Sequence, residues 1–300
     1  MHALDYLFSN IWALTSACAI LGLTVGSFLN VVVYRLPLML QRQWRAQARE
    51  ILTAQETPNS VAGVDPSAEA PENTFNLVYP NSHCPYCETA IKPWHNIPVV
   101  SYLLLGGKCA KCAHPISKRY PLVEIVTALL TALVVWQFGF TLQTIALLLL
   151  TWALIALTLI DFDHQLLPDS ITLPLLWGGL IANTGGLIVS LPDALWGAVA
   201  GYLALWSVYW LFKLITGKEG MGYGDFKLLA ALGAWLGWQI LPLIIILSSL
   251  VGAVVGLGLI VLRRQDKNTP IPFGPYLAAA GWIAALWGEP LMLAYSRYLG

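Results

Sequence analysis

Long apolar runs dominate this chain of 300 residues and limit how it can fold. Hydrophobic residues make up 57% of the sequence and charged residues 11%, whereas an ordinary soluble domain has about 25% charged residues. About 20 apolar residues span the ~30 Å hydrocarbon core of a bilayer. The sequence therefore predicts an all-α polytopic membrane protein with about eight transmembrane helices. The expected spans are residues 11–36, 121–139, 141–160, 171–189, 194–215, 226–241, 242–262 and 272–293.

These spans divide the chain into three segments. Residues 1–36 contain the first transmembrane helix, residues 37–120 form a loop domain, and residues 121–300 form the remaining transmembrane bundle. The first ten residues contain no Lys or Arg, so we expect the first helix to be retained rather than cleaved as a secretory signal. Between the sixth and seventh spans, Pro242 is the only break that we identify.

The loop segment begins with the stretch QRQWRAQAREIL at 41–52, which predicts a helix with basic and apolar faces. Such a helix would lie on the lipid headgroups or be a solvated helix, and the sequence leaves both open. Residues 53–74 are rich in Pro, Ala, Ser and acidic residues, which indicates a flexible linker.

The positions of Lys and Arg predict the orientation, because these residues accumulate on the cytoplasmic side of a membrane. With the N-terminus outside, fifteen of the sixteen basic residues fall on the cytoplasmic face, and only Arg297 lies outside. Both termini are then outside and the 37–120 loop is cytoplasmic. The formal net charge is zero, so we expect membrane lipid but no nucleic acid as a partner. The fifteen residues are Arg35, Arg42, Arg45, Arg49, Lys92, Lys108, Lys111, Lys118, Arg119, Lys213, Lys218, Lys227, Arg263, Arg264 and Lys267.

Four cysteines in the loop have the spacing of a metal site. Cys84 and Cys87 form one C-x2-C pair, and Cys109 and Cys112 form a second pair after 21 intervening residues. Two such pairs deliver four thiolates to a tetrahedral zinc ion. Cytoplasmic thiols stay reduced, which favours zinc over disulfides. Four thiolates leave no open position for substrate, so we expect a structural role in folding the loop. His83, His95 and His114 are nearby, but we expect them to lie outside the ligand set.

Carboxylates at the ends of the spans are the candidate catalytic groups, because ionisable residues within membrane segments are costly. Asp161 ends the third span and Asp225 begins the sixth, both on the predicted cytoplasmic side. Two carboxylates that meet there would share a proton. The ionised one would take a proton from water while the protonated one polarises a peptide carbonyl. In the alternative interpretation, Asp225 is only a helix N-cap.

The other acidic residues have simpler interpretations. Asp169 and Asp193 each lie just before a predicted helix, so we expect both to be N-caps. Glu124 lies near the start of the second span, where it could pair with Arg119 or Lys118. Gly222 and Gly224, which precede Asp225, would permit unusual backbone angles or a close approach of another segment.

Several motifs resemble those of the type IV prepilin leader peptidases, the membrane aspartic proteases of bacterial pilus assembly and type II secretion. The acidic motifs are LIDFDHQLLPD at 159–169 and GMGYGDFKLLAALGAW at 220–235. The segments GSFLNVVVYRLP at 26–37, KRYPLVE at 118–124, PIPFGPYLAAAGW at 270–282 and the four cysteines also match, so the resemblance covers nearly the whole chain. It implies that Asp161 and Asp225 are the catalytic aspartates, with Asp163 and Asp169 in supporting roles.

The resemblance also implies a two-step enzyme in the bacterial inner membrane. The first step would cleave the basic leader from prepilins and pseudopilins on the cytoplasmic side, after a glycine and before a phenylalanine. The second step would methylate the new N-terminal amine with S-adenosylmethionine. No strand–GxGxxG–helix unit is present for this cofactor, and its binding residues are unassigned. We expect methylation to take place in the large loop and the adjoining helix ends.

Three alternatives lie outside this family. A proton-coupled transporter would use Asp161, Asp225 and Glu124 to carry protons, although its coupling sites would normally lie near the middle of the membrane. A transferase acting on lipid diphosphates would use Asp161 and Asp163 to hold magnesium. A structural assembly component would use its acidic residues only as helix caps.

Overall fold

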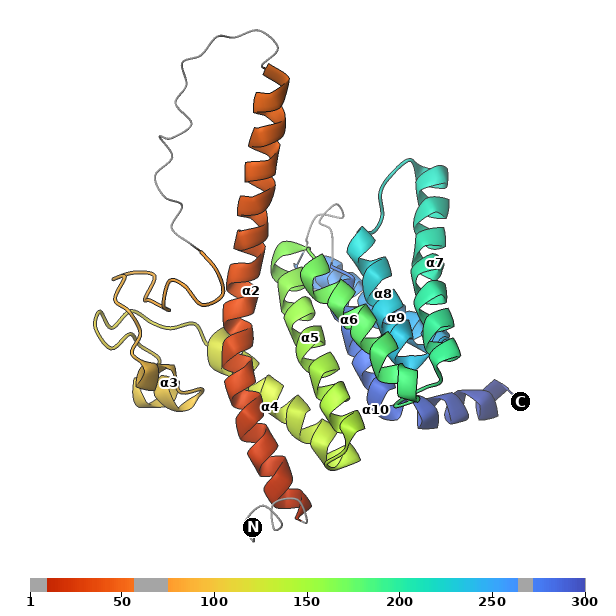
Figure 1. Cartoon of the computed structure of the whole chain (residues 1–300), viewed down its shortest axis with the longest axis horizontal. Helices are drawn as coiled ribbons and strands as arrows, with labels where there is room; N and C mark the ends of the chain where they lie inside the picture. The colour runs from red at the N-terminus through yellow and green to blue at the C-terminus, as the bar shows by residue number, and fades with distance from the viewer. Residues whose placement is uncertain (1–9, 57–74, 264–271, 300) are drawn as a thin grey trace.

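The computed structural model describes residues 10–56, 75–263 and 272–299, and these residues are predominantly helical (Figure 1). The predicted all-α class is confirmed. The described residues contain two isolated β-bridges but no β-strand. The helices are α2 (Ile11–Glu56), α3 (Val100–Leu104), α4 (Arg119–Phe138), α5 (Leu142–His164), α6 (Asp169–Ala182), α7 (Leu191–Thr216), α8 (Tyr223–Leu236), α9 (Leu241–Arg263) and α10 (Gly274–Leu299), with two 3-10 turns, η2 (Pro93–Asn96) and η3 (Asn183–Gly185).

Each of the eight expected spans falls on a helix, but six helices in the described part are long and apolar enough to cross a membrane. These six are α2, α4, α5, α7, α9 and α10. The other two, α6 and α8, have 14 residues each, or about 21 Å at 1.5 Å per residue, which is short of the ~30 Å hydrocarbon core. The chain is a multi-pass membrane protein, and the count of about eight spans is approximate.

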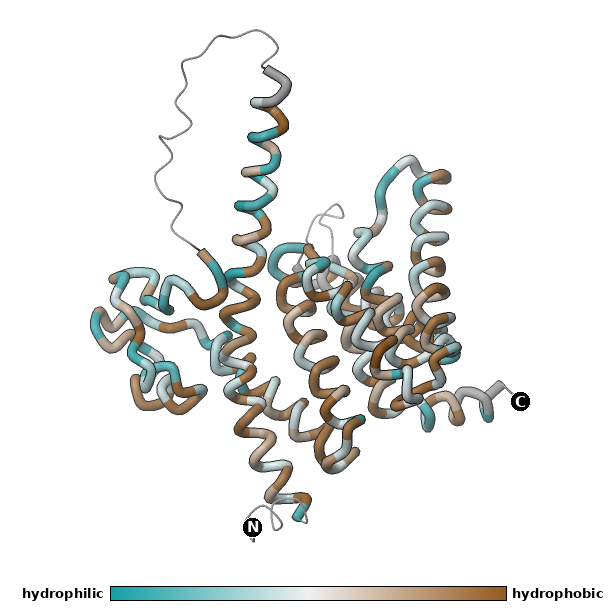
Figure 2. Tube along the Cα trace, viewed as in Figure 1, coloured by the Kyte–Doolittle hydropathy of each residue, from teal (hydrophilic) through white to brown (hydrophobic). Residues whose placement is uncertain are grey.

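The first helix is longer than predicted. α2 continues without interruption through Pro37 for 46 residues, or about 69 Å, and its C-terminal part projects beyond the bundle (Figure 1). That projecting part is largely hydrophilic (Figure 2), and residues 41–53 are exposed. The 41–52 stretch is therefore a straight continuation of a spanning helix. Most of the expected linker, residues 57–74, and the basic residues Arg264 and Lys267 lie outside the described residues.

Glycines allow two helix pairs to pack closely. Gly22 and Gly26 of α2 face the α4 backbone, where an added Cβ would lie 2.7 Å from the Cα atoms of Ala128 and Glu124. Small residues give membrane helices the close backbone approach that replaces the hydrophobic driving force available in water. α7 and α8 use the same device, since a side chain at Gly197 would overlap the backbone of α8.

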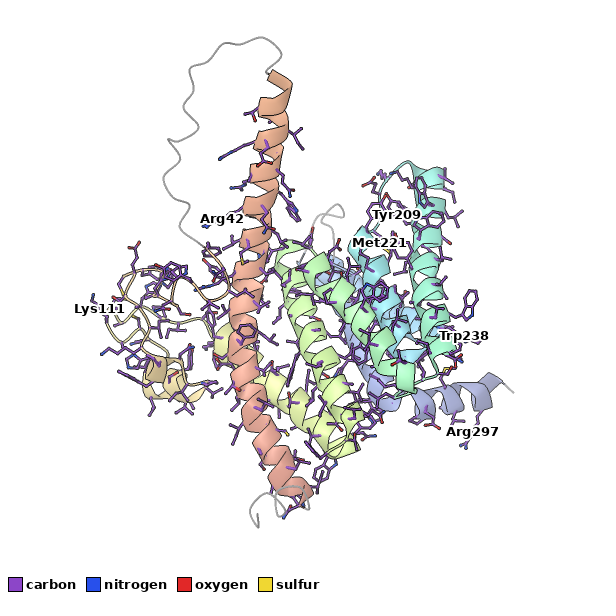
Figure 3. All side chains as sticks on the ribbon, in the orientation of Figure 1. Arg42, Lys111, Tyr209, Met221, Trp238 and Arg297 are labelled. Atoms are coloured by element: carbon purple, nitrogen blue, oxygen red, sulfur yellow. The ribbon has the colours of Figure 1, made fainter. Side chains whose placement is uncertain are left out.

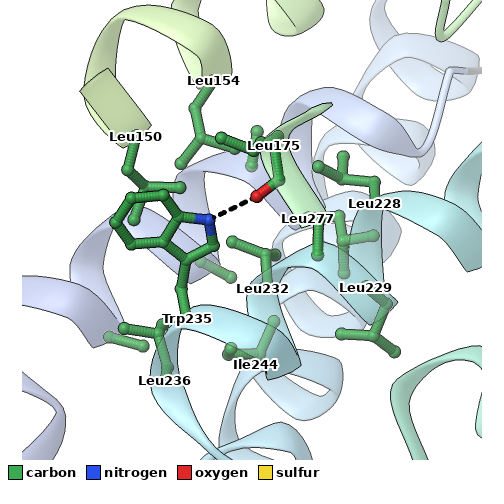
Figure 4. Packing of buried hydrophobic residues seen from close by; sticks show 14 of the residues in the cluster. Leu150, Leu154, Leu175, Leu228, Leu229, Leu232, Trp235, Leu236, Ile244 and Leu277 are labelled. Carbon is green, nitrogen blue, oxygen red and sulfur yellow. Dashed lines mark hydrogen bonds between the residues drawn. The ribbon is translucent and has the colours of Figure 1, made fainter. Parts of the chain in front are cut away.

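The core of the bundle surrounds α8, whose apolar residues are nearly all buried. Figure 4 shows Trp235 of α8 among leucines from α5, α6 and α10, with its indole N–H donating to the Leu175 carbonyl oxygen at 2.8 Å. The side-chain amide of Asn183 also donates to the Ala234 carbonyl oxygen at 2.9 Å. These bonds join α6 and the turn after it to the far end of α8.

The break between α8 and α9 is not where we predicted it. α8 ends at Leu236 because Gly237 has a φ of 83°, a conformation that glycine adopts readily. Pro242 lies inside the first turn of α9, where proline is tolerated because its missing N–H would have no intrahelical partner. The interpretation of Pro242 as the only break was therefore wrong.

Candidate active site and metal centre

Asp161 lies in the last turn of α5. Gln165 adopts a left-handed conformation after this helix, and its backbone N–H donates to the Asp161 carbonyl oxygen at 2.9 Å. The Asp161 side chain is 6% exposed, and its Oδ2 atom is buried without a hydrogen-bond partner in the described part of the structure. Buried polar atoms are normally paired, so this oxygen marks the Asp161 carboxylate as a candidate functional group.

Asp225 lies in the first turn of α8 and is 7% exposed. The N-cap position belongs to Gly222, so the interpretation of Asp225 as an N-cap was wrong. The Gly222 N–H bonds to the Asp225 carboxylate, and the helix dipole also favours a negative charge in this turn.

Neither of the two glycines before Asp225 has an unusual backbone angle, and only Gly224 is in a close approach, since a Cβ at Gly222 would lie 3.8 Å from the nearest atom, Oδ2 of Asp225. Gly222 has a φ of −80°, and Gly224 is part of the helix. A Cβ at Gly224 would lie 2.7 Å from the Cβ of Leu167. Glycine is therefore needed at position 224 because the segment after α5 packs directly against the start of α8.

The structure brings the two aspartates to the same end of the bundle. The end of α5 and the start of α8 lie on one side, next to the start of α6 (Figure 1), and the two carboxylates interact electrostatically. α10 completes the site: a Cβ at Gly274 would lie 2.6 Å from Oδ2 of Asp161 and 3.2 Å from Leu167. Gly274 belongs to the motif PIPFGPYLAAAGW at 270–282, but nothing in that motif predicts a contact with the aspartates.

Each aspartate is followed two residues later by a charged residue that pairs with another helix. Asp163 binds Arg119 at the start of α4, with N–O distances of 2.5 and 2.8 Å. Lys227 binds both oxygens of Asp169 at 2.7 Å. Two predictions were therefore wrong. Arg119 pairs with Asp163 rather than Glu124, and Asp169 does not cap α6, because Pro168 occupies the N-cap position.

Asp193 is also not the cap that we predicted. Ser190 occupies the N-cap of α7, and its hydroxyl oxygen accepts the Asp193 N–H at 3.3 Å. The Asp193 carboxylate accepts bonds from the Ser190 hydroxyl at 2.5 Å and from Trp238 at 3.0 Å. Asp193 thus belongs to a reciprocal capping arrangement that joins α7 to the break after α8.

The turn before Asp225 is fixed by a polar and aromatic cluster at the end of α7, in the region where Figure 3 labels Tyr209. Tyr223 donates to the Tyr209 hydroxyl at 3.3 Å. Lys213 binds Glu219 at 2.8 Å, and this bond holds the pKa of the Glu219 carboxyl below its ordinary value. The cluster therefore ties the turn to α7.

The four loop cysteines meet in space as predicted. The sulfur atoms of Cys84, Cys87, Cys109 and Cys112 all lie within 4.8 Å of one another. The two C-x2-C pairs adopt the same backbone turn. The N–H of the first cysteine in each pair donates to the carbonyl oxygen five residues later, from Cys84 to Thr89 at 3.0 Å and from Cys109 to His114 at 2.8 Å. Glu88 and Ala113 occupy matching positive-φ positions.

The spacing of these sulfur atoms fits a tetrahedral metal. Zinc–sulfur bonds of ~2.3 Å in a tetrahedron place the sulfurs about 3.8 Å apart. Cys84 and Cys112 are 3.8 Å apart, and Cys87 and Cys109 are 4.0 Å apart. Hydrogen bonds with Thr89 also lower the pKa of the Cys87 thiol to about 6, which favours the thiolate that binds metal. None of the three nearby histidines joins this cluster in the described residues.

Arg35 tethers the loop to α2, a role that the sequence analysis missed. This arginine is 6% exposed and donates to the carbonyl oxygens of Asn76 at 2.9 Å and Pro80 at 2.6 Å. A buried guanidinium is stable only when hydrogen bonds satisfy its donors. The two bonds therefore fix where the loop begins relative to the membrane helices.

Two family descriptions match the chain: the Bacterial Peptidase A24 N-terminal domain over residues 20–138 and the Type IV leader peptidase family over residues 148–257. A protein of Pseudomonas aeruginosa named prepilin leader peptidase/N-methyltransferase is 62% identical over 300 residues, which cover 100% of this chain and 99% of the relative. The chain belongs to the type IV leader peptidase family. The predicted resemblance is therefore confirmed.

Other relatives have the same name. The protein of Stutzerimonas stutzeri is 58% identical over 99% of both chains, and that of Legionella pneumophila is 45% identical over 96% of both. No solved structure matches the chain. Membership of this family argues against the transporter, lipid-diphosphate transferase and purely structural alternatives.

Proposed function

We propose that this chain is a membrane aspartic endopeptidase and N-methyltransferase that removes the basic leader of type IV prepilins and type II secretion pseudopilins and then methylates the new N-terminal amine. The observation that carries the first activity is the convergence of two buried carboxylates, Asp161 and Asp225, at one end of the bundle. Full-length relatives with this name support both activities.

The proposed cleavage follows from the geometry of the two aspartates. Two adjacent carboxylates in a desolvated site cannot both ionise easily, so they share one proton. The ionised carboxylate takes a proton from an attacking water, and the protonated one donates a hydrogen bond to the scissile carbonyl oxygen. Gly224 and Gly274 let Leu167 and the start of α10 pack closely around both groups, which keeps the site desolvated.

The distribution of basic residues supports a cytoplasmic site in the bacterial inner membrane. Arg119, Lys213, Lys218 and Lys227 all lie close in sequence to the ends of α4, α7 and α8 that border the aspartates. By the rule that positive charge stays inside, this end of the bundle faces the cytoplasm. A substrate whose basic leader remains inside would then reach the aspartates without crossing the membrane.

The division of labour follows the three segments of the sequence. Residues 121–300 form the catalytic bundle after the first helix, and residues 37–120 form the loop domain held by zinc at Cys84, Cys87, Cys109 and Cys112. S-adenosylmethionine supplies the methyl group of the second step. We place its site in the loop domain and the adjoining helix ends, where a groove of about 1240 Å³ lies between α2, the loop and the start of α4.

The purified protein, incubated with a prepilin and methyl-labelled S-adenosylmethionine, tests both steps at once. We expect mass analysis to show a pilin shortened by its leader and carrying one labelled methyl group on the new N-terminal residue. Cleavage should persist in EDTA when the structural zinc stays bound, whereas a magnesium-dependent transferase would be inactive. A substrate that remains uncut would refute the proposal.

A further inference from the structure

Glu124 is a buried carboxylate that the cleavage mechanism does not use. Its side chain is 7% exposed and lies where α2, α4 and the turn before α3 meet. It accepts the Val99 N–H at 2.8 Å and a bond from the Ser27 hydroxyl. In the part of the chain that the structure describes, no Lys or Arg forms an ion pair with it. A carboxylate at the membrane face without a cation is costly, which indicates a function.

The turn that binds Glu124 is strained. Val99 has a φ of 57° and a ψ of −47°, and the Val100 N–H donates across it to the Pro98 carbonyl oxygen at 2.5 Å. This is the rare and strained form of the three-residue turn, here centred on a β-branched residue. Such strain persists where surrounding structure enforces it, often at functional sites. The bond from Val99 in turn fixes the orientation of the Glu124 carboxylate.

Glu124 also lines the groove beside the loop, and among the described lining residues it is the only acidic one. The volume of about 1240 Å³ exceeds the ~300–1,000 Å³ of ordinary small-molecule sites. The groove can therefore hold a nucleoside-sized methyl donor together with the end of a peptide. The other titratable or charged side chains that line the groove are Tyr34, Arg35 and Arg42 of α2, Tyr79, His83, Cys84, Tyr86, Lys92, His95, Tyr102, Cys109, Lys111 and His114 of the loop, and Tyr120 of α4.

The groove lies next to the aspartate site. Arg119, which precedes the groove residues Tyr120 and Pro121, forms the ion pair with Asp163, two residues after Asp161. The start of α4 therefore forms the boundary between the two sites. This ion pair connects the edge of the groove to the segment that carries Asp161.

We propose that Glu124 is the catalytic residue that binds the newly exposed N-terminal ammonium group of the cleaved substrate in this groove and takes one of its protons before methyl transfer. This inference rests on the proposed function. The ammonium group loses a proton to the Glu124 carboxylate and becomes a neutral amine. The nitrogen lone pair forms a bond to the methyl carbon, and the carbon–sulfur bond breaks with its electrons remaining on sulfur. The product is a secondary ammonium group, and Glu124 returns its proton to water.

The direction of charge movement explains why the carboxylate faces the amine rather than the donor. Positive charge leaves sulfur and develops on nitrogen during transfer. A carboxylate at the sulfonium would stabilise the ground state and slow the reaction, whereas one at the nitrogen stabilises the transition state. The remaining lone pairs of the Glu124 oxygens can accept the N–H groups of the ammonium.

The test uses a peptide that already begins at the mature N-terminus, so that methylation is measured independently of cleavage. We expect Glu124→Gln to lower kcat for methylation about 100-fold near pH 7, in the range for loss of a general base. The kcat of this variant should recover as the pH rises above the amine pKa of about 8, because the amine then loses its proton without a base. The Gln side chain still accepts the Val99 N–H. Prepilin cleavage and the affinity for S-adenosylhomocysteine, measured by calorimetry, should change less than twofold. Glu50→Gln, on the exposed end of α2, is the matched control.

Three outcomes would overturn this role. The first is a Glu124→Gln enzyme that methylates the peptide with the rate and pH profile of the unmodified enzyme. The second, which needs no variant, is an unmodified enzyme whose methylation at saturating peptide follows only the titration of the free amine. The third is an unmodified enzyme that cleaves prepilin but does not methylate the peptide, which would remove the proposed second step as well.

Discussion

A substitution at Gly274 tests the geometry of the aspartate site, because the backbone of this glycine lies so close to Asp161 that no side chain fits between them. A Cβ added at this position would lie 2.6 Å from Oδ2 of Asp161 and 3.2 Å from the Cγ of the same carboxylate. Real Cβ atoms essentially never come within 3.0 Å of another heavy atom. Gly274→Ala therefore forces either the carboxylate or the start of α10 to move.

The size of the effect follows from this overlap. An ordinary contact needs at least about 3.4 Å, so the oxygen or the helix must shift by roughly 0.8 Å. A misplacement of ~1 Å at a catalytic group costs about 100-fold in rate. Overpacking of a filled core costs about 1–3 kcal/mol of stability. We therefore expect cleavage to fall about 100-fold while the protein remains folded.

Prepilin cleavage would be measured in detergent or in lipid vesicles at saturating substrate, with thermal unfolding of the same samples as the check on folding. Gly258→Ala is the matched control. This glycine lies within α9, and an added Cβ there would meet no heavy atom within 4 Å. The control should cleave at the unmodified rate. A folded Gly274→Ala enzyme that also cleaves at that rate would show that the carboxylate position does not matter as we propose.

Two further predictions concern the metal centre and an ion pair. Replacing Cys84 and Cys87 with Ser should abolish the bound zinc, measured by atomic absorption, and make the loop sensitive to protease, because four thiolates fold this loop; unchanged metal content would reject the site. Lys227→Met should reduce cleavage about tenfold but lower the free energy of unfolding by less than about 1 kcal/mol, because exposed ion pairs contribute little to stability. The exchange of the two charges, Asp169→Lys with Lys227→Asp, should restore cleavage. A Lys227→Met enzyme that cleaves as fast as the unmodified enzyme would exclude a positioning role for this pair.

The elements that the sequence predicts well depend on local patterns. Apolar runs predict the helices because each spanning helix must be continuously apolar. The two C-x2-C pairs predict the sulfur cluster because each pair folds as its own short turn, and both turns are the same. The acidic motifs place Asp161 and Asp225 at helix ends, where the structure has them.

The elements that the sequence does not predict depend on distant contacts. Nothing near Gly274 in sequence indicates that it touches Asp161, more than a hundred residues earlier. The partner of Arg119 is equally hidden, since Glu124 is local and Asp163 belongs to another helix. Caps are ambiguous for a different reason: Ser190 and Asp193 are both good cap residues, and only backbone geometry shows that Ser190 holds the position. Pro37 similarly suggests a helix end, although α2 continues through it.

The measurement that tests the central claim most directly is a double-mutant cycle on the two aspartates. Prepilin cleavage would be compared for Asp161→Asn, Asp225→Asn and the double variant, each shown to be folded by methylation of a peptide with a mature N-terminus. Groups that act as one unit have strongly non-additive effects. We predict that each single substitution abolishes cleavage as completely as the double substitution does. A single variant that still cleaves at a substantial rate, or losses that add on a logarithmic scale, would contradict a shared-proton pair.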